Sequence, residues 1–312
     1  MATRRLISVM TPCYNEEGNV EPLHEAVAAA FAGLPDYDWE HIFIDNASID
    51  GTAAVLRKMA AADPKVKVIL NTRNFGQMRS PYYGALQAFG DAVIPMAADL
   101  QDPPSLIPEF VAKWEEGYRV VQAVKTGAQE SRLMYAVRRL YYRLVTDLSE
   151  VRLVKNTTGF GLYDKQVMDI LRSMHEAYPY FRGLTAELGF EPALVEYEQP
   201  SRARGITSNN FFSLYDVAMA GITSHSRVPL RIATMLGFAS ALVSMLIAFV
   251  YLVYKIVNWQ TFSVGIAPVV IGLFFFGSVQ LFFLGVVGEY IGAIYTQVLN
   301  RPLVVEKERI NF

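Results

Sequence analysis

Apolar runs of strand length alternate with amphipathic stretches of helix length along the first 125 residues. Short apolar runs between turn residues predict buried strands, and apolar positions recurring every three or four residues predict helices. The predicted strands cover 6–11, 39–45, 66–71, 92–96 and 119–124. The predicted helices cover 19–31, 52–61, 81–89 and 106–116. This alternation predicts an α/β fold, with a mostly parallel sheet and helices on both of its faces.

The pattern is weaker over the next part of the chain, where we predict one long helix at 133–148 and strands at 160–163 and 192–198. We expect residues 1–208 to form one domain. In the stretch 209–228, Phe211, Leu214, Tyr215, Ala218 and Ile222 recur at helical spacing. Its place before a long apolar segment favours an amphipathic helix in the membrane interface, although a helix of a soluble core has the same pattern.

Residues 229–296 contain two long stretches without any charged side chain. Each supplies the roughly 20 apolar residues that a bilayer crossing needs. We therefore predict a transmembrane hairpin, with helices at about 232–254 and 264–288. Basic residues flank it outside the hairpin, whereas its connection holds Lys255 alone, so the positive-inside rule predicts both termini, and the tail 297–312, in the cytosol. The flanking basic residues are Arg227, Arg231, Arg301, Lys307 and Arg309.

Composition supports a membrane protein, because 52% of the 312 residues are hydrophobic and only 19% are charged. A net charge of −2 gives no basis for a nucleic-acid partner. Cys13 is the single cysteine, which excludes an internal disulfide, and four scattered histidines argue against a histidine zinc site. No signal peptide precedes the first strand, so we expect residues before about 225 to stay in the cytosol.

The clearest candidate chemistry lies at 97–104, Ala-Ala-Asp-Leu-Gln-Asp-Pro-Pro, directly after the predicted strand 92–96. In open α/β sheets, ligands bind at the carboxyl ends of the strands. Asp99 and Gln101 are two residues apart, so in an extended segment they face the same side. Two oxygen ligands there can hold Mg²⁺ or Mn²⁺, with diphosphate oxygens and water completing the coordination. The alternative is a solvated loop before a helix that starts at Ser105.

Polar residues also follow the first three predicted strands, at 11–17, 44–52 and 71–76. Asp45 can accept hydrogen bonds from a ribose or a base, and Tyr14 offers an aromatic face and a hydroxyl. Arg73 has the charge to steady a phosphate, although an ordinary surface arginine fits the sequence equally well. These side chains are expected at the same sheet edge as Asp99.

Several runs together resemble glycosyltransferase family 2. They are Pro-Cys-Tyr-Asn-Glu at 12–16, Ile-Asp-Asn-Ala-Ser-Ile-Asp-Gly-Thr at 44–52, Arg-Asn-Phe-Gly at 73–76 and Ala-Asp-Leu-Gln-Asp-Pro-Pro at 98–104. Within that family, the chain resembles the polyprenyl-phosphate glycosyltransferases, which include dolichyl-phosphate mannose synthase and phage bactoprenol glucosyltransferases. Gly-Glu-Tyr-Ile-Gly at 288–292, Arg-Pro-Leu at 301–303 and the two-span hairpin extend the resemblance over nearly the whole chain.

The resemblance implies a GT-A fold that transfers a hexose, with inversion, from a nucleotide-sugar to a polyprenyl phosphate at the bacterial inner membrane. UDP is the expected nucleotide, with GDP and dTDP as alternatives. The motif positions assign the nucleotide-sugar pocket to Pro12, Tyr14, Glu16, Asp45, Arg73 and Asp99. Asp99 matches the second Asp of the Asp-x-Asp metal motif, and Gln101 matches a glutamine that contacts the cation in relatives, so both are the expected catalytic and metal-binding residues.

An acceptor phosphate needs a basic cradle near the bilayer, and arginine's planar fork suits phosphate. The candidates are Lys125, Arg132, Arg138, Arg139 and Arg202. Arg202 is favoured because it precedes the predicted interfacial helix; a solvated or lipid-headgroup role is the alternative for each. Glycines in the spans and the resemblance to bacterial proteins also lead us to expect a homo-oligomer.

The sequence departs from the family pattern at four places, one of which is the absence of the basic residue usual near Ser208. Ala97 stands for the first Asp of the Asp-x-Asp motif, Asn46 for the second Asp of an Asp-Asp pair, and Thr-Gly-Phe-Gly-Leu at 158–162 for Gly-Asp-Phe-Arg-Leu. These changes motivate a second hypothesis, a non-catalytic protein that binds the sugar nucleotide or the lipid phosphate. A processive polysaccharide synthase is disfavoured because the sequence has no Gln-x-x-Arg-Trp motif.

Overall fold

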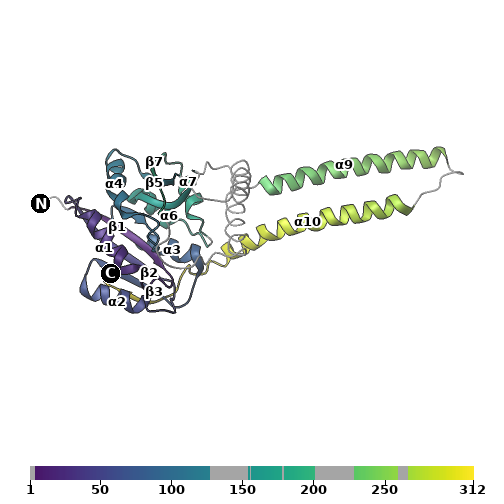
Figure 1. Cartoon of the computed structure of the whole chain (residues 1–312). Coiled ribbons are helices and arrows are strands. Elements are labelled where there is room, and N and C mark those ends of the chain that lie inside the picture. Colours follow the sequence, from purple (N-terminus) through teal and green to yellow (C-terminus); the bar gives the residue numbers. More distant parts are fainter. Residues whose placement is uncertain (1–3, 127–153, 155, 178, 201–227, 259–265) are drawn as a thin grey trace.

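The computed structural model describes residues 4–126, 154, 156–177, 179–200, 228–258 and 266–312. These residues form an α/β domain from which two long apolar helices project (Figure 1). The predicted helix 133–148 lies outside the described residues, as does the predicted interfacial helix 209–228 except for its last residue.

The domain is built on an eight-stranded sheet in the order β7-β5-β6-β4-β1-β2-β3-β8. Within the described residues, β6 and β8 run antiparallel to their neighbours, and the other strands point the same way. The strands are β1 (Arg5–Cys13), β2 (Tyr37–Asp45), β3 (Val66–Asn71), β4 (Ala92–Pro95), β5 (Val120–Lys125), β6 (Thr157–Asp164), β7 (Pro192–Tyr197) and β8 (Glu306–Ile310). This is the predicted mostly parallel α/β sheet.

Helices cover both faces of the sheet. On one face pack α1 (Val20–Phe31), α2 (Thr52–Ala62) and α4 (Ile107–Glu115), which follows a short 3-10 helix, η1 (Pro104–Leu106). On the other face pack α3 (Gly76–Leu86), α6 (Lys165–Ser173) and α7 (Phe181–Glu187). A sheet buried on both faces accounts for the continuous apolar runs of the central strands.

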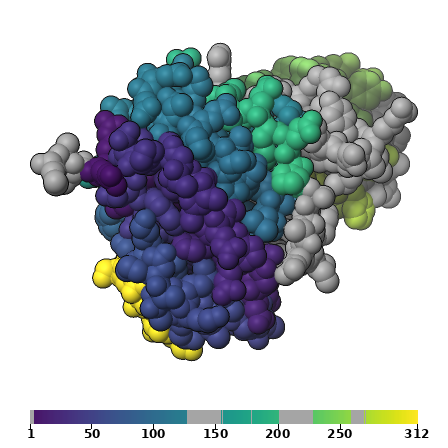
Figure 2. Space-filling model, turned by 60° about the vertical axis from the view of Figure 1, so that its left-hand side comes forward, coloured from purple at the N-terminus to yellow at the C-terminus, as the bar shows by residue number. Residues whose placement is uncertain are grey.

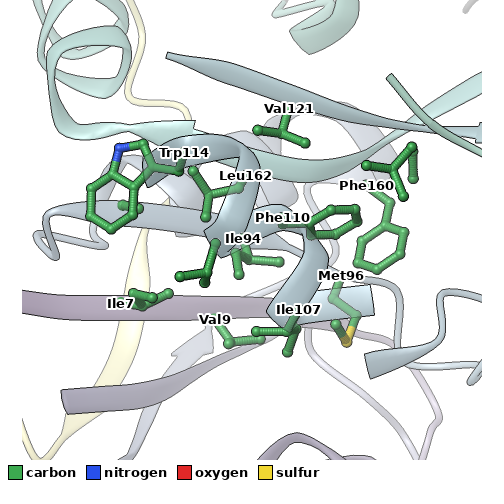
Figure 3. Packing of buried hydrophobic residues seen from close by; sticks show 14 of the residues in the cluster. Ile7, Val9, Ile94, Met96, Ile107, Phe110, Trp114, Val121, Phe160 and Leu162 are labelled. Carbon is green, nitrogen blue, oxygen red and sulfur yellow. The ribbon is translucent and has the colours of Figure 1, made fainter. Parts of the chain in front are cut away.

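The largest cluster of buried side chains lies between the sheet and helices α1 and α4. Ile107, Phe110 and Trp114 of α4 meet Val9 of β1 and Ile94 of β4 (Figure 3). The three helical positions follow the spacing of one helix face. Burying an aliphatic or aromatic side chain contributes roughly 1.5–3 kcal/mol, so this layer fixes α4, and the loop before it, against the sheet.

Most predicted elements are confirmed to within two or three residues at each end, but the predicted helix 81–89 is wrong. The helix begins five residues earlier, at Gly76, and carries Pro81 inside it. Proline is most common at the first turn of a helix, which is why the sequence placed the start there. The helix also ends before residue 89. At this end, the guanidinium of Arg172 donates hydrogen bonds to the carbonyls of Leu86 and Ala88.

The residues after the second apolar helix return to the domain. The backbone N–H of Thr72 donates to the Val305 carbonyl at 3.0 Å, and β8 then pairs with β3. Arg57 forms an ion pair with Glu308 at 2.7 Å. Figure 2 shows these C-terminal residues in yellow along the surface of the N-terminal half. This strand was not predicted, since its charged sequence Glu-Lys-Glu-Arg-Ile lacks an apolar run.

The two apolar helices are α9 (Val228–Val257) and α10 (Ile266–Val298). Both are long and apolar enough to cross a membrane, and their most apolar windows are not buried in the protein. They extend from the same side of the domain (Figure 1). Two such helices agree with the predicted hairpin in number, but α10 ends ten residues beyond the predicted end at 288.

Candidate active site

The parallel strands β1, β2, β3, β4 and β5 bring their carboxyl ends to one edge of the sheet. The antiparallel strand β6 starts at that same edge, because Thr157 pairs with Val124 near the end of β5. The topology therefore gathers polar residues from distant parts of the sequence, as expected for ligand sites in open α/β sheets.

The loops after β1 and β2 are joined by reciprocal hydrogen bonds. The Asn15 N–H donates to Ser48 Oγ at 2.8 Å, and the Ile49 N–H donates to Asn15 Oδ1 at 2.9 Å. The Glu16 N–H donates to the buried hydroxyl of Thr52 at 2.8 Å. We call residues 14–19 and 46–52 the rim. The two segments of the rim therefore satisfy each other's backbone N–H groups, and these bonds hold the rim residues in place.

Asp45 lies at the base of the rim and is 2% exposed. Its carboxylate accepts from the Ser48 N–H at 3.1 Å and from the Ser48 hydroxyl. Burial raises the pKa of Asp45, and the bonds from Ser48 act in the opposite direction. Tyr14 is 41% exposed, while Glu16 accepts a 2.6 Å bond from the Asn19 amide. Of the predicted nucleotide-binding residues, Tyr14 and Glu16 thus lie on the rim, and Asp45 directly precedes its second segment.

Asn46 fastens the loop after β3 to the rim. Its Oδ1 accepts from Asn71 Nδ2 at 3.2 Å and from the Phe75 N–H at 2.9 Å. Its Nδ2 donates to Asn74 Oδ1 at 2.9 Å and to the Gly76 carbonyl at 3.2 Å. An ionised aspartate has no N–H to donate, so these contacts explain why an amide suits position 46.

Arg73 lies in the loop that Asn46 holds. Its guanidinium sits 4.0 Å from the ring centre of Phe75 and donates to the Asn74 carbonyl at 3.0 Å. Both contacts lie within the loop itself. Arg73 is exposed at the sheet edge and does not line the cavity described below.

The segment after β4 turns instead of continuing as a strand. Leu100 has a positive φ of 59°, and Asp99 Oδ1 accepts from the Gln101 N–H at 3.2 Å. The expectation of an extended Asp99–Gln101 segment is therefore wrong, because this Asx-type turn reverses the chain. Asp102 fixes the turn from below: its carboxylate accepts from the Ala97 N–H at 3.0 Å and from the Tyr197 hydroxyl at 3.3 Å.

A cavity of about 590 Å³ opens beside this turn. Four of the predicted site residues line it, whereas Tyr14, Glu16, Asp45 and Arg73 do not. The four are Pro12, Asp99, Gln101 and Lys125. The rest of its wall comes from α3, from 158–160 of β6, from 179–182, from residues 95–97, and from Met10, Asp102 and Gln199. The structure thus separates the predicted residues: four line the cavity, Tyr14 and Glu16 lie on the rim, Asp45 lies at its base, and Arg73 lies in the loop after β3. The other basic candidates, Arg132, Arg138, Arg139 and Arg202, lie outside the described residues.

The chain is similar to known glycosyltransferases over most of its length. The model of Glycosyl transferase family 2 matches residues 8–172. A bactoprenol glucosyl transferase of Shigella phage SfII is 33% identical over 306 residues, covering 97% of both chains. An uncharacterised glycosyltransferase of Synechocystis sp. is 34% identical over 298 residues, covering 95% of this chain and 93% of its own.

The chain belongs to glycosyltransferase family 2. Among solved structures, it is similar to glucosyl-3-phosphoglycerate synthase from Mycobacterium tuberculosis in complex with Mn²⁺, uridine diphosphate and phosphoglyceric acid. That similarity has a TM-score of 0.47 at 19% identity and covers 70% of this chain and 76% of the other. The family model and the relatives matched over nearly the whole chain show that the protein is a glycosyltransferase, and its α/β domain is followed by two apolar helices.

The cavity of this family 2 enzyme also includes residues that the sequence did not single out. The guanidinium of Arg182 donates to the Thr157 carbonyl at 2.7 Å and lies 5.2 Å from the ring centre of Tyr180. Gln77 lines the same cavity from α3. Arg182 follows three aromatic or proline residues in a region without clear periodicity, so only the fold reveals its place.

The oxygen donors of the cavity suit a hard divalent cation. No three His, Cys, Asp or Glu side chains gather into a metal site among the described residues. Asp102 uses its carboxylate to fix the turn, which leaves Asp99 and Gln101 as the candidate protein ligands. Mg²⁺ is commonly held by one or two carboxylates together with substrate phosphates, so this small donor set fits a cation that binds with a diphosphate.

Proposed function

We propose that this glycosyltransferase moves a hexose from a nucleotide-sugar, with a UDP-sugar as the expected donor, to a polyprenyl phosphate at the cytosolic face of the membrane. The observation that supports the proposal is the cavity at the carboxyl edge, because Asp99, Gln101 and Lys125 all line it. The relatives named bactoprenol glucosyl transferase, similar over nearly the whole chain, support a lipid-linked acceptor.

The proposed donor binds with its nucleotide on the rim and its diphosphate toward Asp99. Tyr14 offers its ring to the base, and Asp45 lies at the strand end beneath. Asp99 and Gln101 would hold Mg²⁺ or Mn²⁺, and the bound cation would supply charge neutralisation for a nucleoside diphosphate leaving group. Pro12 lies at the end of β1, where the rim meets the cavity.

In the proposed reaction, an acceptor phosphate oxygen attacks the anomeric carbon. The bond from that carbon to the donor diphosphate oxygen breaks, so the configuration inverts and the nucleoside diphosphate leaves with the bonding electrons. A phosphate oxygen is already anionic near neutral pH, so the residues need not supply a general base. Their work is positioning and charge stabilisation. Lys125 and Arg182 are the described cavity cations for the acceptor phosphate.

The proposed setting is the bacterial inner membrane, with α9 and α10 as a two-span hairpin and both termini in the cytosol. In this setting the cavity would lie near the inner leaflet, because Gln297 of α10 bonds to Ala177, two residues before the cavity residue Pro179. Figure 1 shows the end of α10 at the domain. The remaining basic candidates, Arg132, Arg138, Arg139 and Arg202, complete the proposed phosphate cradle. The enzyme is proposed to act as a homo-oligomer.

The test is a transfer assay with purified full-length enzyme, a C55 polyprenyl phosphate, Mg²⁺ or Mn²⁺, and labelled UDP-, GDP- and dTDP-hexoses. We expect label in the lipid fraction for at least one donor, with mass spectrometry showing one hexose per lipid phosphate. Donor binding without any lipid product across the panel would favour the non-catalytic alternative.

A further inference from the structure

Gln297, near the end of α10, contacts the polypeptide that leads into the cavity wall. Its Oε1 accepts from the Ala177 N–H at 3.0 Å, and its Nε2 donates to the His175 carbonyl. One side chain of a helix long enough to cross a membrane therefore holds two backbone groups of the domain.

The segment that Gln297 holds is short and lies directly before the wall. Ala177 is two residues before Pro179, and Pro179, Tyr180, Phe181 and Arg182 all line the cavity. Phe181 also packs on the buried Tyr163, with 4.9 Å between ring centres. The wall is thus packed on the domain at 181 and tied to α10 at 175 and 177.

The rest of the C-terminal segment attaches elsewhere. Leu303 packs on the core cluster beneath α3, and the Tyr83 hydroxyl donates to Glu306 at 2.8 Å. β8 then completes the sheet beside β3. These contacts hold the end of α10 against the domain. Gln297 therefore has a fixed position next to the backbone of 175–177.

We propose that Gln297 is a positioning residue, which holds the cavity wall at 179–182 in place through its bonds from α10. In this position, Arg182 of the wall and Lys125 can both contact the acceptor phosphate. The identity of the acceptor in this inference rests on the proposed function. The coupling between α10 and the cavity wall rests on the geometry alone. It assigns to α10 a part in substrate binding beyond anchoring the enzyme.

Gln297→Met is the appropriate variant, because methionine keeps the length and helix propensity of glutamine and offers neither an amide donor nor an amide acceptor. Thr296→Ala is the matched control. Thr296 donates within α10, to the Gly292 carbonyl at 2.9 Å. Both variants change one side chain in the same helical turn, and only the first removes a bond to the domain.

We expect amide hydrogen exchange in peptides covering 174–184 to be several-fold faster in Gln297→Met than in the wild type, with no change in Thr296→Ala. The KM for C55 polyprenyl phosphate should rise about tenfold, in line with the loss of two hydrogen bonds. The dissociation constant for UDP should stay within about twofold, because the rim is held independently of α10.

Unchanged exchange over 174–184 in Gln297→Met would overturn the inference, and so would an equal increase in Thr296→Ala. Should Gln297→Met lose its fold, Gln297→Glu gives the second measurement, since it keeps an acceptor for the Ala177 N–H and lacks the donor to His175. Its exchange at 174–184 should also exceed that of the wild type. If the wild type transfers no sugar at all, the proposed function fails, while the exchange comparison still decides the inference.

Discussion

The rim and the cavity wall are held in place in two different ways. In the rim, two loops after adjacent parallel strands satisfy each other's backbone groups, with Asn15, Ser48 and Thr52 as the connecting side chains. The wall at 179–182 is instead tied through Gln297 to a helix outside the α/β domain. If the proposed function holds, the nucleotide side is held within the α/β domain, whereas the acceptor side depends on α10.

The largest effect on this comparison should come from Asn46→Asp. An ionised carboxylate would face the Gly76 carbonyl and Asn74 Oδ1, where the amide now donates two hydrogen bonds. We expect the unfolding free energy to fall by about 3 kcal/mol, or roughly 6–12 °C in melting temperature, together with weaker UDP binding. Thermal denaturation and UDP calorimetry measure both, and a variant as stable as the wild type would show that Asn46 does not fasten the loop.

Thr52→Val breaks the rim with almost no change in side-chain volume. It removes the hydroxyl that accepts from Glu16 and donates to Asp50 Oδ1 at 2.6 Å. Leaving these groups unpaired should cost about 2 kcal/mol and weaken UDP binding severalfold. Thr72→Val makes the same change where the chain after α10 joins β3. If both valine variants lowered UDP affinity equally, the rim would not be the nucleotide-binding region.

Buried His41 of β2 contacts half-buried His24 of α1, and this pair should make stability depend on pH. His41 contacts Thr11 Oγ1 at 3.0 Å and His24 Nδ1 at 3.2 Å. Burial lowers the pKa of His41 well below its ordinary value, and burial also lowers the pKa of His24. The unfolded chain therefore binds more protons below about pH 6.5, so stability is full above that pH and is lost as the pH falls.

We expect one buried histidine to cost about 1.4 kcal/mol per pH unit below about pH 6.5. Melting temperatures from pH 7.5 to 5.5 measure the slope, and His41→Gln should flatten it. Parallel profiles for the wild type and His41→Gln would contradict the assignment to this residue.

The smallest effect should come from Ala97→Asp, which adds a possible cation ligand to the cavity and removes none of its contacts. Ala97 lines the cavity beside Asp99, so a carboxylate there adds an oxygen ligand for a divalent cation. We expect the Mn²⁺ concentration that half-saturates UDP binding to fall about fivefold, which is about 1 kcal/mol. Ala97→Asn is the control of equal shape without the charge, and equal Mn²⁺ dependence in the two variants would place the cation elsewhere.

The sequence predicted the elements whose apolar residues face the core, such as β1 and α4, because burial imposes a period on them. It failed where the structure depends on distant contacts. Pro81 was taken as a helix start, although the loop that Asn46 fastens begins α3 at Gly76. The strand β8 is charged and is recognised only through its pairing with β3.

The candidate site was predicted in part for the same reason. Asp99 and Gln101 were identified from their place after a strand, and both line the cavity, although through a turn at Leu100 rather than an extended segment. No local sequence pattern identifies Arg182 or Gln297 as a site residue. Their contacts cross 25 and 120 residues of sequence, and only the assembled sheet brings their partners within reach.

The most direct test of the account compares the initial rate of sugar transfer to C55 polyprenyl phosphate in Asp99→Asn with that in Asp36→Asn. Asp36 is an exposed aspartate before β2, so the control makes the same change of charge away from the cavity. We expect Asp99→Asn to lower the rate by roughly 100-fold or more and Asp36→Asn to leave it unchanged. Transfer by Asp99→Asn at the wild-type rate would contradict the proposal that the sugar leaves its diphosphate at this edge of the sheet.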